Sequence, residues 1–564
     1  MTKNYYRLLI KEIIEKKLDL EHTLKLRRSM ARELHPAIFP SLIQILLNAD
    51  ETEISKLRHL ITKPTRTISG VAPVAVMTMP IACPPQARCT YCPGGPNSVF
   101  GSVPKAYTGR EPATLRAIRN DYDPYLQIFN RLEQYLIMGL SPSKVEIIIM
   151  GGTFTSFPDE YQDNFVKFVY KAMNDFGEFF FKAGNFDFIK FKEFFELPAD
   201  INDAGRMAIL KSKMYQSKGS TELGFEKKRN ETAAIRCVGL TIETRPDCAM
   251  LHHANTMLAQ GATRIEVGIQ SVYDAVLTKI KRGHTVNDTI ESIRILKDLG
   301  FKINGHYMLG LPDTDLEMDL SGLKELFSNP DFRPDMLKIY PCMVMSGTEL
   351  CNDFKDGLFE PMTTKAAINV LKEFKKDVPK YLRIMRVQRD IPTNVTEAGV
   401  DRTNLRQYLA NELKAEKIRC RCIRCRESGR AAKIEETSLL AEKYDASHGV
   451  EYFISIEDTK NDVIIGFCRM RFPSQSLRSE ITDKTALIRE LHVYSPLVEI
   501  GKLANKYQHQ HRGFGKMLLN KAEEIAVDNG KDKMVVISGV GVREYYYKHG
   551  YKEDGPYVSK ALLQ

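Results

Sequence analysis

Between residues 73 and 341 the sequence alternates short apolar runs with longer stretches of helical character, and this alternation constrains the fold more than any other feature. Strands that alternate with helices favour βα units built around a parallel sheet. A closed barrel of such units needs eight strands. Because six runs are present, the sequence predicts an α/β fold with a partial, TIM-like (βα)6 barrel. The runs are residues 74–79, 145–150, 237–243, 264–269, 302–309 and 336–340.

The segments around this central unit differ from it in composition. Residues 1–70 place apolar residues at helical spacing between basic ones, which predicts a basic helical region. The central unit is expected to cover residues 71–400, with a helical insertion near 175–235. Residues 342–440 are predicted as mostly helical, and the part from 401 to 440 is predicted as a linker that carries cysteines.

Composition argues against a membrane protein and indicates one kind of partner. The chain has no run of about 18 apolar residues, and its N-terminus lacks the features of a signal peptide, so a cytoplasmic location is expected. Residues 1–68 hold 13 Lys and Arg against 8 Asp and Glu, and residues 419–430 hold five arginines and one glutamate. These two segments are candidates for binding a polyanion such as nucleic acid, and solvated surface is the alternative.

Three cysteines, Cys83, Cys89 and Cys92, stand within "CPPQARCTYC" in the loop after the first apolar run. Clustered thiols in a reducing compartment indicate metal or redox ligands rather than disulfides. Three thiolates can hold a 4Fe–4S cluster and leave one iron without a protein ligand. A zinc loop with a distant fourth ligand is the alternative. Loops at the carboxyl ends of barrel strands are where the active sites of barrels form.

The motifs around this triad resemble those of the radical-SAM enzymes. In "MGGTF", Gly151, Gly152 and Thr153 stand where that superfamily holds the amino group of S-adenosylmethionine. The cysteine spacing is C-x5-C-x2-C, whereas the superfamily usually has C-x3-C-x2-C. The resemblance implies a 4Fe–4S cluster that cleaves S-adenosylmethionine to a 5′-deoxyadenosyl radical. Further motifs at positions of cofactor contacts are "EVGIQS" (266–271), "RGHT" (282–285) and "HYMLGLP" (306–312).

A second triad, Cys420, Cys422 and Cys425, forms the motif "CRCIRC". Three thiolates this close on one loop predict a metal site. Zinc with a remote fourth ligand is the first expectation, and an auxiliary iron–sulfur cluster is the alternative. The sequence does not identify the fourth ligand, and the position between two predicted domains suits a structural clip. The other cysteines are expected in the core: Cys237, Cys248, Cys342, Cys351 and Cys468.

Residues 441–564 are predicted as a second domain. Three apolar runs give successive strands, and a glycine-rich turn, a helix and a final strand follow. The turn "QHRGFG" (510–515) comes after the strand "ELHV" (490–493) and before an amphipathic helix. Backbone N–H groups at such a helix N-terminus can hold a pyrophosphate. This order resembles the GNAT acetyltransferases, and an unrelated α/β module is the alternative.

The GNAT resemblance implies an acetyl-CoA site whose residues can be named. In that family the strand before the turn pairs with the pantetheine arm, and the late motif "YYYKHGY" aligns with the family's "FYEKLGF"-like motif. Tyr546 then takes the place of the catalytic tyrosine, a general acid for the leaving CoA thiolate. The implied contacts are Glu490, Leu491, His492, Val493, Gly513, Phe514, Gly515 and Tyr546.

A radical-SAM unit and a GNAT domain in one chain resemble the family of Elongator catalytic subunits, in its archaeal branch. The likeness covers nearly the whole chain and includes "YCPGGP", "YTGREP", "TIETRPD", "LKIYP", "RVQRDIP" and "VISGVGVREYY". The first cysteine gap is shorter than in eukaryotic members, and the insertion near 175–235 is longer.

This resemblance implies that the enzyme converts the wobble uridine of tRNA to 5-carboxymethyluridine, with acetyl-CoA as the carbon source. It also implies that Lys144 contacts the acyl-CoA from the barrel side. The expected partner is the anticodon stem-loop of tRNA, held by the two basic segments, with the target base splayed out. A homodimer is left open.

Two other functions remain as alternatives. A protein lysine acetyltransferase with a vestigial barrel predicts a degenerate first cysteine triad. A non-catalytic tRNA-binding scaffold predicts loss of Tyr546 or of the glycine turn. The three cysteines, Tyr546 and the glycine turn are all present, which favours the tRNA-modifying enzyme.

Overall fold

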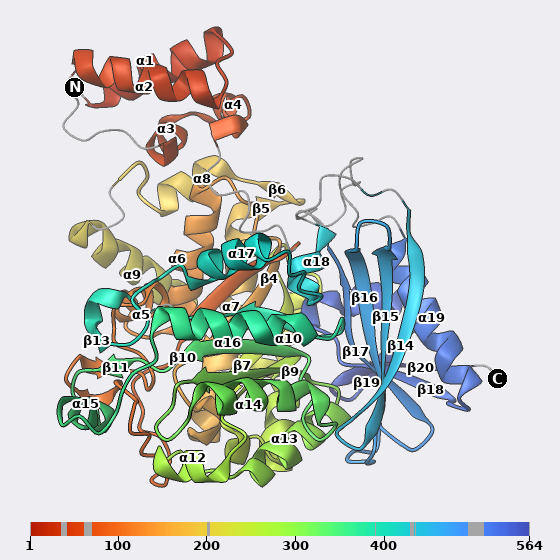
Figure 1. Cartoon of the computed structure of the whole chain (residues 1–564). Helices are drawn as coiled ribbons and strands as arrows, with labels where there is room; N and C mark the ends of the chain where they lie inside the picture. Colours follow the sequence, from red (N-terminus) through yellow and green to blue (C-terminus); the bar gives the residue numbers. More distant parts are fainter. Residues whose placement is uncertain are drawn as a thin grey trace.

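The computed structural model describes residues 2–34, 42–60, 70–199, 203–389, 391–428, 434, 436–494 and 513–562. A group of N-terminal helices, a parallel sheet covered by helices and a second, mixed sheet follow one another along the chain (Figure 1). Residues 510–512 of the predicted glycine turn and residues 429–430 of the second basic segment lie outside the described residues. Within the described ranges, no helix has both the length and the apolar character needed to cross a bilayer.

A curved, wholly parallel sheet of seven strands forms the centre, and each strand lies beside the next one in sequence. This confirms the predicted partial barrel and its six strands. The seventh strand, β12, lies in the region predicted as mostly helical, and it pairs with β10. Its four residues are too few to show the alternation of inward and outward side chains that marks a strand. The strands are β1 (Ala72–Met77), β4 (Lys144–Met150), β7 (Arg236–Thr244), β8 (Arg264–Gln270), β9 (Lys302–Leu309), β10 (Met336–Pro341) and β12 (Arg383–Arg386).

Several of the helices packed around this sheet begin at capping residues. Asp123 accepts from the N–H groups of Tyr125 and Leu126 at the start of one helix, and Thr285 forms a capping box with Asp288 at the start of another. The helices are α5 (Pro112–Arg119), α6 (Pro124–Ile137), α7 (Asp159–Phe180), α11 (Leu251–Ala259), α12 (Asp274–Lys279), α13 (Val286–Asp298), α14 (Leu316–Ser328), α15 (Glu349–Lys355), α16 (Thr364–Asp377) and α17 (Leu405–Ala415).

The two faces of the parallel sheet differ in chemistry. On β4, Val145, Ile147 and Ile149 are fully buried in the main hydrophobic core. The alternate residues are only half-buried, and Ile148 and Met150 among them line a cavity. Because successive side chains of a strand point to opposite faces, the inner face of the barrel opens on that cavity and is not filled as in a closed barrel.

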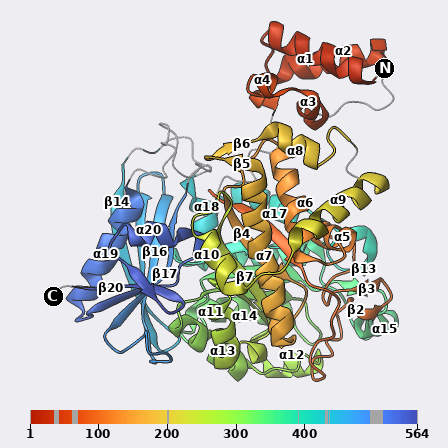
Figure 2. The ribbon, with the colours of Figure 1, turned by 180° about the vertical axis from the view of Figure 1, so that it is seen from behind.

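The insertion near 175–235 is mostly helical, as predicted, and includes a short hairpin of β5 (Phe181–Lys182) and β6 (Asn185–Phe186). Beside it lie the N-terminal helices, and Lys192 donates to the main-chain oxygen of Ala49 at 3.2 Å (Figures 1 and 2). The insertion holds α8 (Phe188–Phe194), α9 (Ala204–Lys218) and α10 (Leu223–Asn230); the N-terminal helices are α1 (Thr2–Glu15), α2 (Leu20–Leu34), α3 (Leu42–Asn48) and α4 (Glu51–Ile54).

The second sheet has the order β14-β15-β16-β17-β18-β20-β19. Strands β17 and β18 pair in parallel from Thr485 to Ile488, and beyond Ile488 β17 continues beside β16 alone. Its side toward β18 is therefore open at the residues expected to bind acetyl-CoA. The sequence did not predict β14, and it predicted one strand after α19 where the structure has three. The elements are β14 (Ser438–Ala446), β15 (Gly449–Asp458), β16 (Val463–Phe472), β17 (Thr485–Val493), α19 (Phe514–Asp528), β18 (Lys533–Val536), α20 (Arg543–Tyr547), β19 (Lys552–Asp554) and β20 (Tyr557–Ala561).

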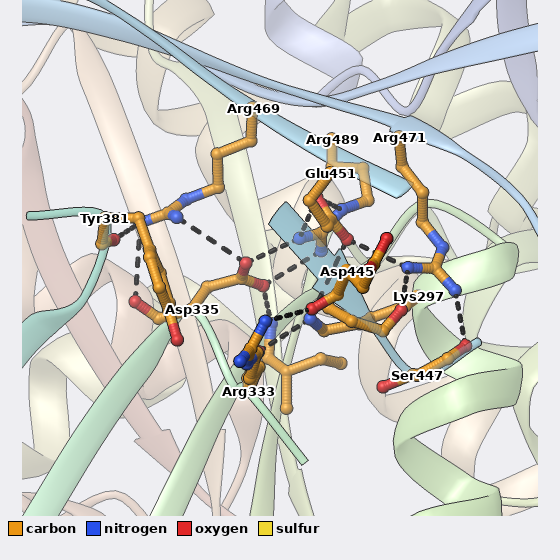
Figure 3. Close-up of polar contacts among 12 residues, drawn as sticks. Lys297, Arg333, Asp335, Tyr381, Asp445, Ser447, Glu451, Arg469, Arg471 and Arg489 are labelled. Carbon is orange, nitrogen blue, oxygen red and sulfur yellow. Dashed lines mark hydrogen bonds and ion pairs between the residues drawn. The ribbon is translucent and has the colours of Figure 1, made fainter. Parts of the chain in front are cut away.

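A buried network of charges joins the two sheets (Figure 3). Arg489 on β17 donates to Asp335, which precedes β10, at 2.9 and 2.5 Å and to Glu451 on β15 at 3.0 Å. Arg469 on β16 lies 3.6 Å from Asp335 and donates to the main-chain oxygen of Tyr381 at 2.7 Å. The four charged side chains are fully buried.

Arg471 forms a second junction in the same network. It donates to Asp298, the last residue of α13, at 2.7 Å and to Glu451 at 3.1 Å. It also donates to the main-chain oxygen of Ala446 at 2.7 Å, and Lys297 lies 3.7 Å from Glu451. Buried charges are tolerated only where they are paired and hydrogen-bonded, so this network fixes how the two sheets face each other.

Replacing Asp335 by asparagine should lower the free energy of unfolding by about 3–5 kcal/mol, because the guanidinium of Arg489 then stays buried without its main counter-charge. Guanidinium chloride denaturation measures the loss. Glu15→Gln is the matched control, since the ion pair of Glu15 with Lys11 is exposed at both ends, and its effect should stay within about 0.5 kcal/mol. Equal losses in the two variants would contradict the role of the network.

Candidate functional site

The first cysteine triad lines a cavity of about 690 Å³ at the carboxyl ends of the parallel strands. The N–H groups of Arg88 and Thr90 in the cysteine loop donate to the main-chain oxygens of Lys281 and Ile280, both at 3.1 Å. The predicted motif "RGHT", which begins at Arg282, therefore lies directly beside the cysteines. The loop is held on the barrel by the turn after α12.

Two of the three sulfur atoms receive hydrogen bonds from the protein. Arg282 Nη1 donates to Cys89 Sγ at 3.4 Å, and the N–H group of Ala106 donates to Cys92 Sγ at 3.3 Å. Donors that point at sulfur favour the thiolate, which is the form that binds metals. The guanidinium also supplies positive charge next to a site that would otherwise gather several anionic sulfur atoms.

The two cysteine triads differ in how far apart their sulfur atoms lie. Across the described part of the chain, two groups of Cys, His or acidic residues bring their ligand atoms within 4.8 Å of one another, and the first cysteine triad is not among them. Ligands of a single zinc ion lie closer together, because each Zn–S bond is about 2.3 Å. The wider first triad fits a multi-iron cluster better than a single ion. The two converging groups are Cys420, Cys422 and Cys425, and Glu243, Glu266 and His306.

The glycine motif after β4 needs glycine at two successive positions. Gly151 has φ +136°, and a Cβ there would lie 2.0 Å from the Thr78 hydroxyl oxygen; Gly152 has φ +106°, and a Cβ would lie 3.0 Å from Lys105 Cβ. Gly152 and Thr153 line the cavity beside the cysteines. The absence of side chains leaves the backbone open to a ligand there, as the resemblance to the radical-SAM enzymes implies.

A charged group inside the barrel was not recognised as a unit from the sequence. Lys338 contacts the carboxylate of Glu266 and lies 3.7 Å from that of Glu243, and His306 Nε2 lies 3.0 Å from Glu266. Tyr107 donates to Glu243 at 3.1 Å. All four residues belong to motifs quoted above, Glu243 to "TIETRPD" and Lys338 to "LKIYP", but these two motifs indicated family likeness alone. A charged residue at an inward position of an otherwise apolar strand is the signal that finds them.

The electrostatics of this group set its protonation near neutral pH. Burial raises the pKa of Glu243 to about 7; the charge of Lys338 lowers it and that of Glu266 raises it. Burial lowers the pKa of His306 to about 4, so its ring is neutral at pH 7. The ammonium of Lys338 supplies the positive charge that holds the two carboxylates together.

The strand predicted to bind acetyl-CoA lies at the opposite end of the barrel. Glu490 accepts from Arg469 at 2.9 Å and lies 4.0 Å from Lys302, the first residue of β9. The ring of His492 lies 4.4 Å from that of Tyr494, centroid to centroid. The strand, Glu490 to Val493, thus faces the amino ends of the barrel strands, whereas the cysteines lie at their carboxyl ends.

Lys144 is the first residue of β4, at that same amino end. Its neighbour in register is Arg236 on β7, which donates to Glu544 in α20 at 2.6 Å. Burial lowers the pKa of Lys144 to about 8. Lys144 thus lies beside a residue that contacts the helix carrying Tyr546, and its contact with acyl-CoA stays a prediction.

Two tyrosines of α20 lie in different surroundings, Tyr546 in the core and Tyr545 beside the glycine turn. Tyr546 is 5% exposed and packs in the core of the second sheet, where burial raises the pKa of its hydroxyl. A Cβ at Gly515 would lie 2.8 Å from the hydroxyl oxygen of Tyr545, so Tyr545 is the tyrosine that borders the turn. Gly513, with φ +84°, caps α19, and Phe514 is its first residue.

The second cysteine triad lies against a buried lysine. Lys375 Nζ lies 3.3 Å from Cys420 Sγ and 3.9 Å from Cys425 Sγ, and Lys375 is almost completely buried. The converging group contains no fourth Cys, His or acidic residue from the described ranges. The N–H group of Ile423 in α18 (Ile423–Arg426) donates to the main-chain oxygen of Leu382 at 3.0 Å, beside β12. The triad thus lies where the two sheets meet, as expected of a clip.

The second basic segment is only partly available to a polyanion. Arg426 is buried, donates to Asp462 at 2.6 Å and contacts Glu457, while Arg419 lies 3.1 Å from Asp462. Arg426 thus serves the junction between the sheets and is not available to a nucleic acid, whereas Arg419 and Arg421 are exposed, so the binding of nucleic acid by this segment stays a prediction. Sequence reasoning missed a different basic group, at the cavity: Arg88, Arg116, Arg131, Arg386 and Arg389.

Comparisons with known proteins agree with this two-part arrangement. Family models match for the Radical SAM superfamily over residues 209–321, the Radical_SAM C-terminal domain over 334–415 and the Acetyltransferase (GNAT) family over 419–551. The chain is similar to the tRNA uridine(34) acetyltransferase of Methanocaldococcus infernus, with 44% identity over 532 residues, 93% of this chain and 92% of that protein.

Two further likenesses extend over most of the chain. One is to Elongator complex protein 3 of Saccharomyces cerevisiae, with 41% identity over 520 residues, 90% of this chain and 86% of that protein. The other is to the solved structure of the archaeal Methanocaldococcus infernus Elp3 with an N-terminal deletion (1–46). It aligns with a TM-score of 0.70 and 40% identity, and the match covers 88% of this chain and 100% of that one. The resemblances to radical-SAM enzymes, to GNAT acetyltransferases and to the Elongator family are thereby confirmed.

Gly151→Ala should abolish S-adenosylmethionine cleavage, because a Cβ at φ +136° would collide with Thr78. The measurement is the formation of 5′-deoxyadenosine by the anaerobically reconstituted protein. Gly224→Ala is the control, since a Cβ at that position meets nothing within 4 Å, and its yield should equal that of the unchanged protein. Full activity of Gly151→Ala would show that the motif does not approach the cofactor.

Cys422→Ser should remove one bound zinc ion per chain, because two thiolates and a lysine cannot complete a structural site. Metal analysis of protein purified without chelator measures it, with Cys351→Ala, a buried cysteine outside both triads, as the control. Loss of iron and sulfide rather than of zinc in Cys422→Ser would instead support the auxiliary cluster, because the first triad is unchanged in this variant.

Proposed function

The chain belongs to the family of the tRNA uridine(34) acetyltransferases and Elongator complex protein 3, and from this premise we propose that it is an acyltransferase that modifies uridine 34 of tRNA. The finer proposal is that the product is 5-carboxymethyluridine. Acetyl-CoA supplies two carbon atoms: its methyl group would lose a hydrogen atom to the 5′-deoxyadenosyl radical and add to C5 of the uracil. The adduct would lose one electron, to the oxidised cluster, and the C5 proton to restore the ring, and hydrolysis of the thioester would leave a carboxylate and release CoA.

The carboxyl end of the barrel is the proposed radical site. Cys83, Cys89 and Cys92 are its proposed ligands for a 4Fe–4S cluster, and their wide spacing and the two hydrogen bonds to sulfur support this assignment. When bound, this cluster and S-adenosylmethionine supply the 5′-deoxyadenosyl radical that takes the hydrogen atom. Gly151 and Gly152 let the backbone approach the cofactor.

The amino end of the barrel is the proposed acyl-CoA site. The open side of β17 from Glu490 to Val493 would pair with the pantetheine arm, and the backbone of Gly513, Phe514 and Gly515 at the start of α19 would hold the pyrophosphate. Lys144 approaches from the barrel. Tyr546 remains the proposed general acid, and its buried position calls for a channel along α20.

The main support for this function is that one barrel bears both proposed sites, one at each end of its strands. β9 begins at Lys302 beside Glu490 and ends at Leu309, where the N–H group of Cys342 donates to its oxygen next to the cavity. The two proposed sites thus lie at opposite ends of one barrel, and an acyl group and a radical that act on one substrate would have to meet along it. A protein acetyltransferase would not use the cysteine cavity, and a binding scaffold would use neither end.

The test is an anaerobic reconstitution with iron, sulfide, S-adenosylmethionine, acetyl-CoA, a reductant and tRNA. We expect mass spectrometry to detect both 5′-deoxyadenosine and 5-carboxymethyluridine. Both should fall at least a hundredfold in Cys89→Ala and stay unchanged in Cys351→Ala, because a cluster that lacks one of three ligands is lost.

Other outcomes separate the rival functions. Deoxyadenosine without modified uridine would contradict the product while leaving the radical site in place. Acetylated lysine on protein, with neither product, would favour the acetyltransferase with a vestigial barrel.

A further inference from the structure

The charged group inside the barrel forms a continuous tier across four neighbouring strands, with an offset of two residues at β9, where Asn304 is the register partner of Glu266. Glu243 on β7 is the register partner of Glu266 on β8, and His306 on β9 is the register partner of Lys338 on β10. Inward residues of neighbouring strands make such a layer in a parallel barrel. All four side chains line the same cavity as the first cysteine triad.

Three members of the tier face the cavity, and one supports them. The side chains of Glu243, His306 and Lys338 are 12%, 12% and 14% exposed, whereas that of Glu266 is fully buried. Glu266 contacts Lys338 and accepts from Asn304 at 3.1 Å, so its charge orients the ammonium. The side chains available to a ligand are therefore a carboxylate and an ammonium, 3.7 Å apart, with a neutral imidazole beside them.

The tier slopes from the strand ends into the barrel, beside the proposed cofactor site. Glu243 stands one residue before the end of β7, whereas Glu266 stands four residues before Gln270, the last residue of β8, which corresponds to about 13 Å along a strand. The cysteine loop, Gly152 and Thr153 line the upper part of the cavity, at the strand ends. A ligand that reaches the tier thus comes to lie beside a cofactor held at the cysteines.

The pairing of an acceptor with a neighbouring donor indicates the chemistry of that ligand. The Watson–Crick edge of uracil presents a donor, N3–H, between two acceptors, O4 and O2. A carboxylate beside an ammonium complements this edge. The carbonyl of an acetyl thioester only accepts hydrogen bonds, so the carboxylate would repel it. Cytosine has an acceptor at N3, where the carboxylate would again repel.

We propose that Glu243 and Lys338 recognise the target base, Glu243 by accepting a hydrogen bond from N3–H of uracil and Lys338 by donating one to an adjacent carbonyl oxygen. This inference rests on the proposed function and names its specificity determinants. Glu266 is a positioning residue that holds Lys338. Enzymes that act on a nucleobase take it into a pocket and recognise its Watson–Crick edge by hydrogen bonds.

The cavity wall suits a nucleotide that enters in this way. Arg88 is exposed and Arg386 and Arg389 are half-buried, and all three line the cavity. Guanidinium groups are the side chains best suited to phosphate. They can hold the backbone of the anticodon loop while one base reaches the tier.

The first experiment measures binding rather than turnover. Anticodon stem-loop RNAs that differ only in U34 or C34 compete for the reconstituted full chain, with S-adenosylmethionine bound. We expect the unchanged protein to prefer U34 at least tenfold. In Glu243→Gln the preference should fall below about threefold, because an amide can present either a donor or an acceptor to N3. Glu373→Gln is the matched control, since its ion pair with Lys376 is exposed at both ends and neither residue lines the cavity.

A second readout separates recognition from a purely structural role. The groups that face Glu243 are Tyr107, Glu266 and Lys338. As pH falls from 8 to 6, Glu243 gains a proton and can donate to N3 of cytosine, so the U34 preference should decrease in the unchanged protein. It should stay flat in Glu243→Gln. A preference that is independent of pH in both proteins would overturn the inference.

The third readout excludes a role in holding the cofactor. RNA-free formation of 5′-deoxyadenosine should stay within about threefold in Glu243→Gln and in Lys338→Met, while Lys338→Met weakens U34 binding at least tenfold. Loss of deoxyadenosine in both variants would assign the tier to S-adenosylmethionine instead. Failure of the proposed function shows differently: the unchanged protein would then bind U34 selectively but form no carboxymethyluridine.

Discussion

The arrangement of this protein depends on the buried ion network around Asp335. An interface made only of apolar side chains can shift by small steps, whereas a buried guanidinium that loses its carboxylate is left as an uncompensated charge in a medium of low dielectric. Arg469, Arg471 and Arg489 each meet at least one carboxylate across or beside the junction. The second sheet therefore has one favourable orientation, with the far end of β17 against the amino ends of the barrel strands.

Close backbone packing adds to this constraint. A Cβ at Gly539 would lie 2.2 Å from the main-chain oxygen of Val238, and one at Gly541 would lie 2.6 Å from Arg236 Cβ. The glycines of "VISGVGVREYY" thus let the loop before α20 lie directly on β7. From the sequence this motif indicated family likeness alone. In the structure it fixes the distance between the helix that carries Tyr546 and the barrel strand beside Lys144.

Features with a local signature were predictable, and features assembled from distant residues were not. The six barrel strands have a clear apolar pattern, and each cysteine triad lies within ten residues, so both were found. Strand β12 is too short to show a period. Arg426 looked like part of a basic surface because the chain around it is rich in arginine, and its acidic partners lie more than thirty residues later. The tier draws one residue from each of four strands, so no local window contains it.

The tier also explains why the inside of this barrel is polar. Barrel interiors are commonly filled by branched aliphatic side chains, whereas here the inner face carries charges whose burial must be offset by pairing. Glu266 is matched by Lys338, His306 is neutral at pH 7, and the pKa of Glu243 lies near 7. The net charge of the tier is thus small, and a neutral base can replace water there without stranding an ion. An uncharged heterocycle that offers donors and acceptors along one edge is the kind of ligand that such a space accommodates at the lowest cost in desolvation.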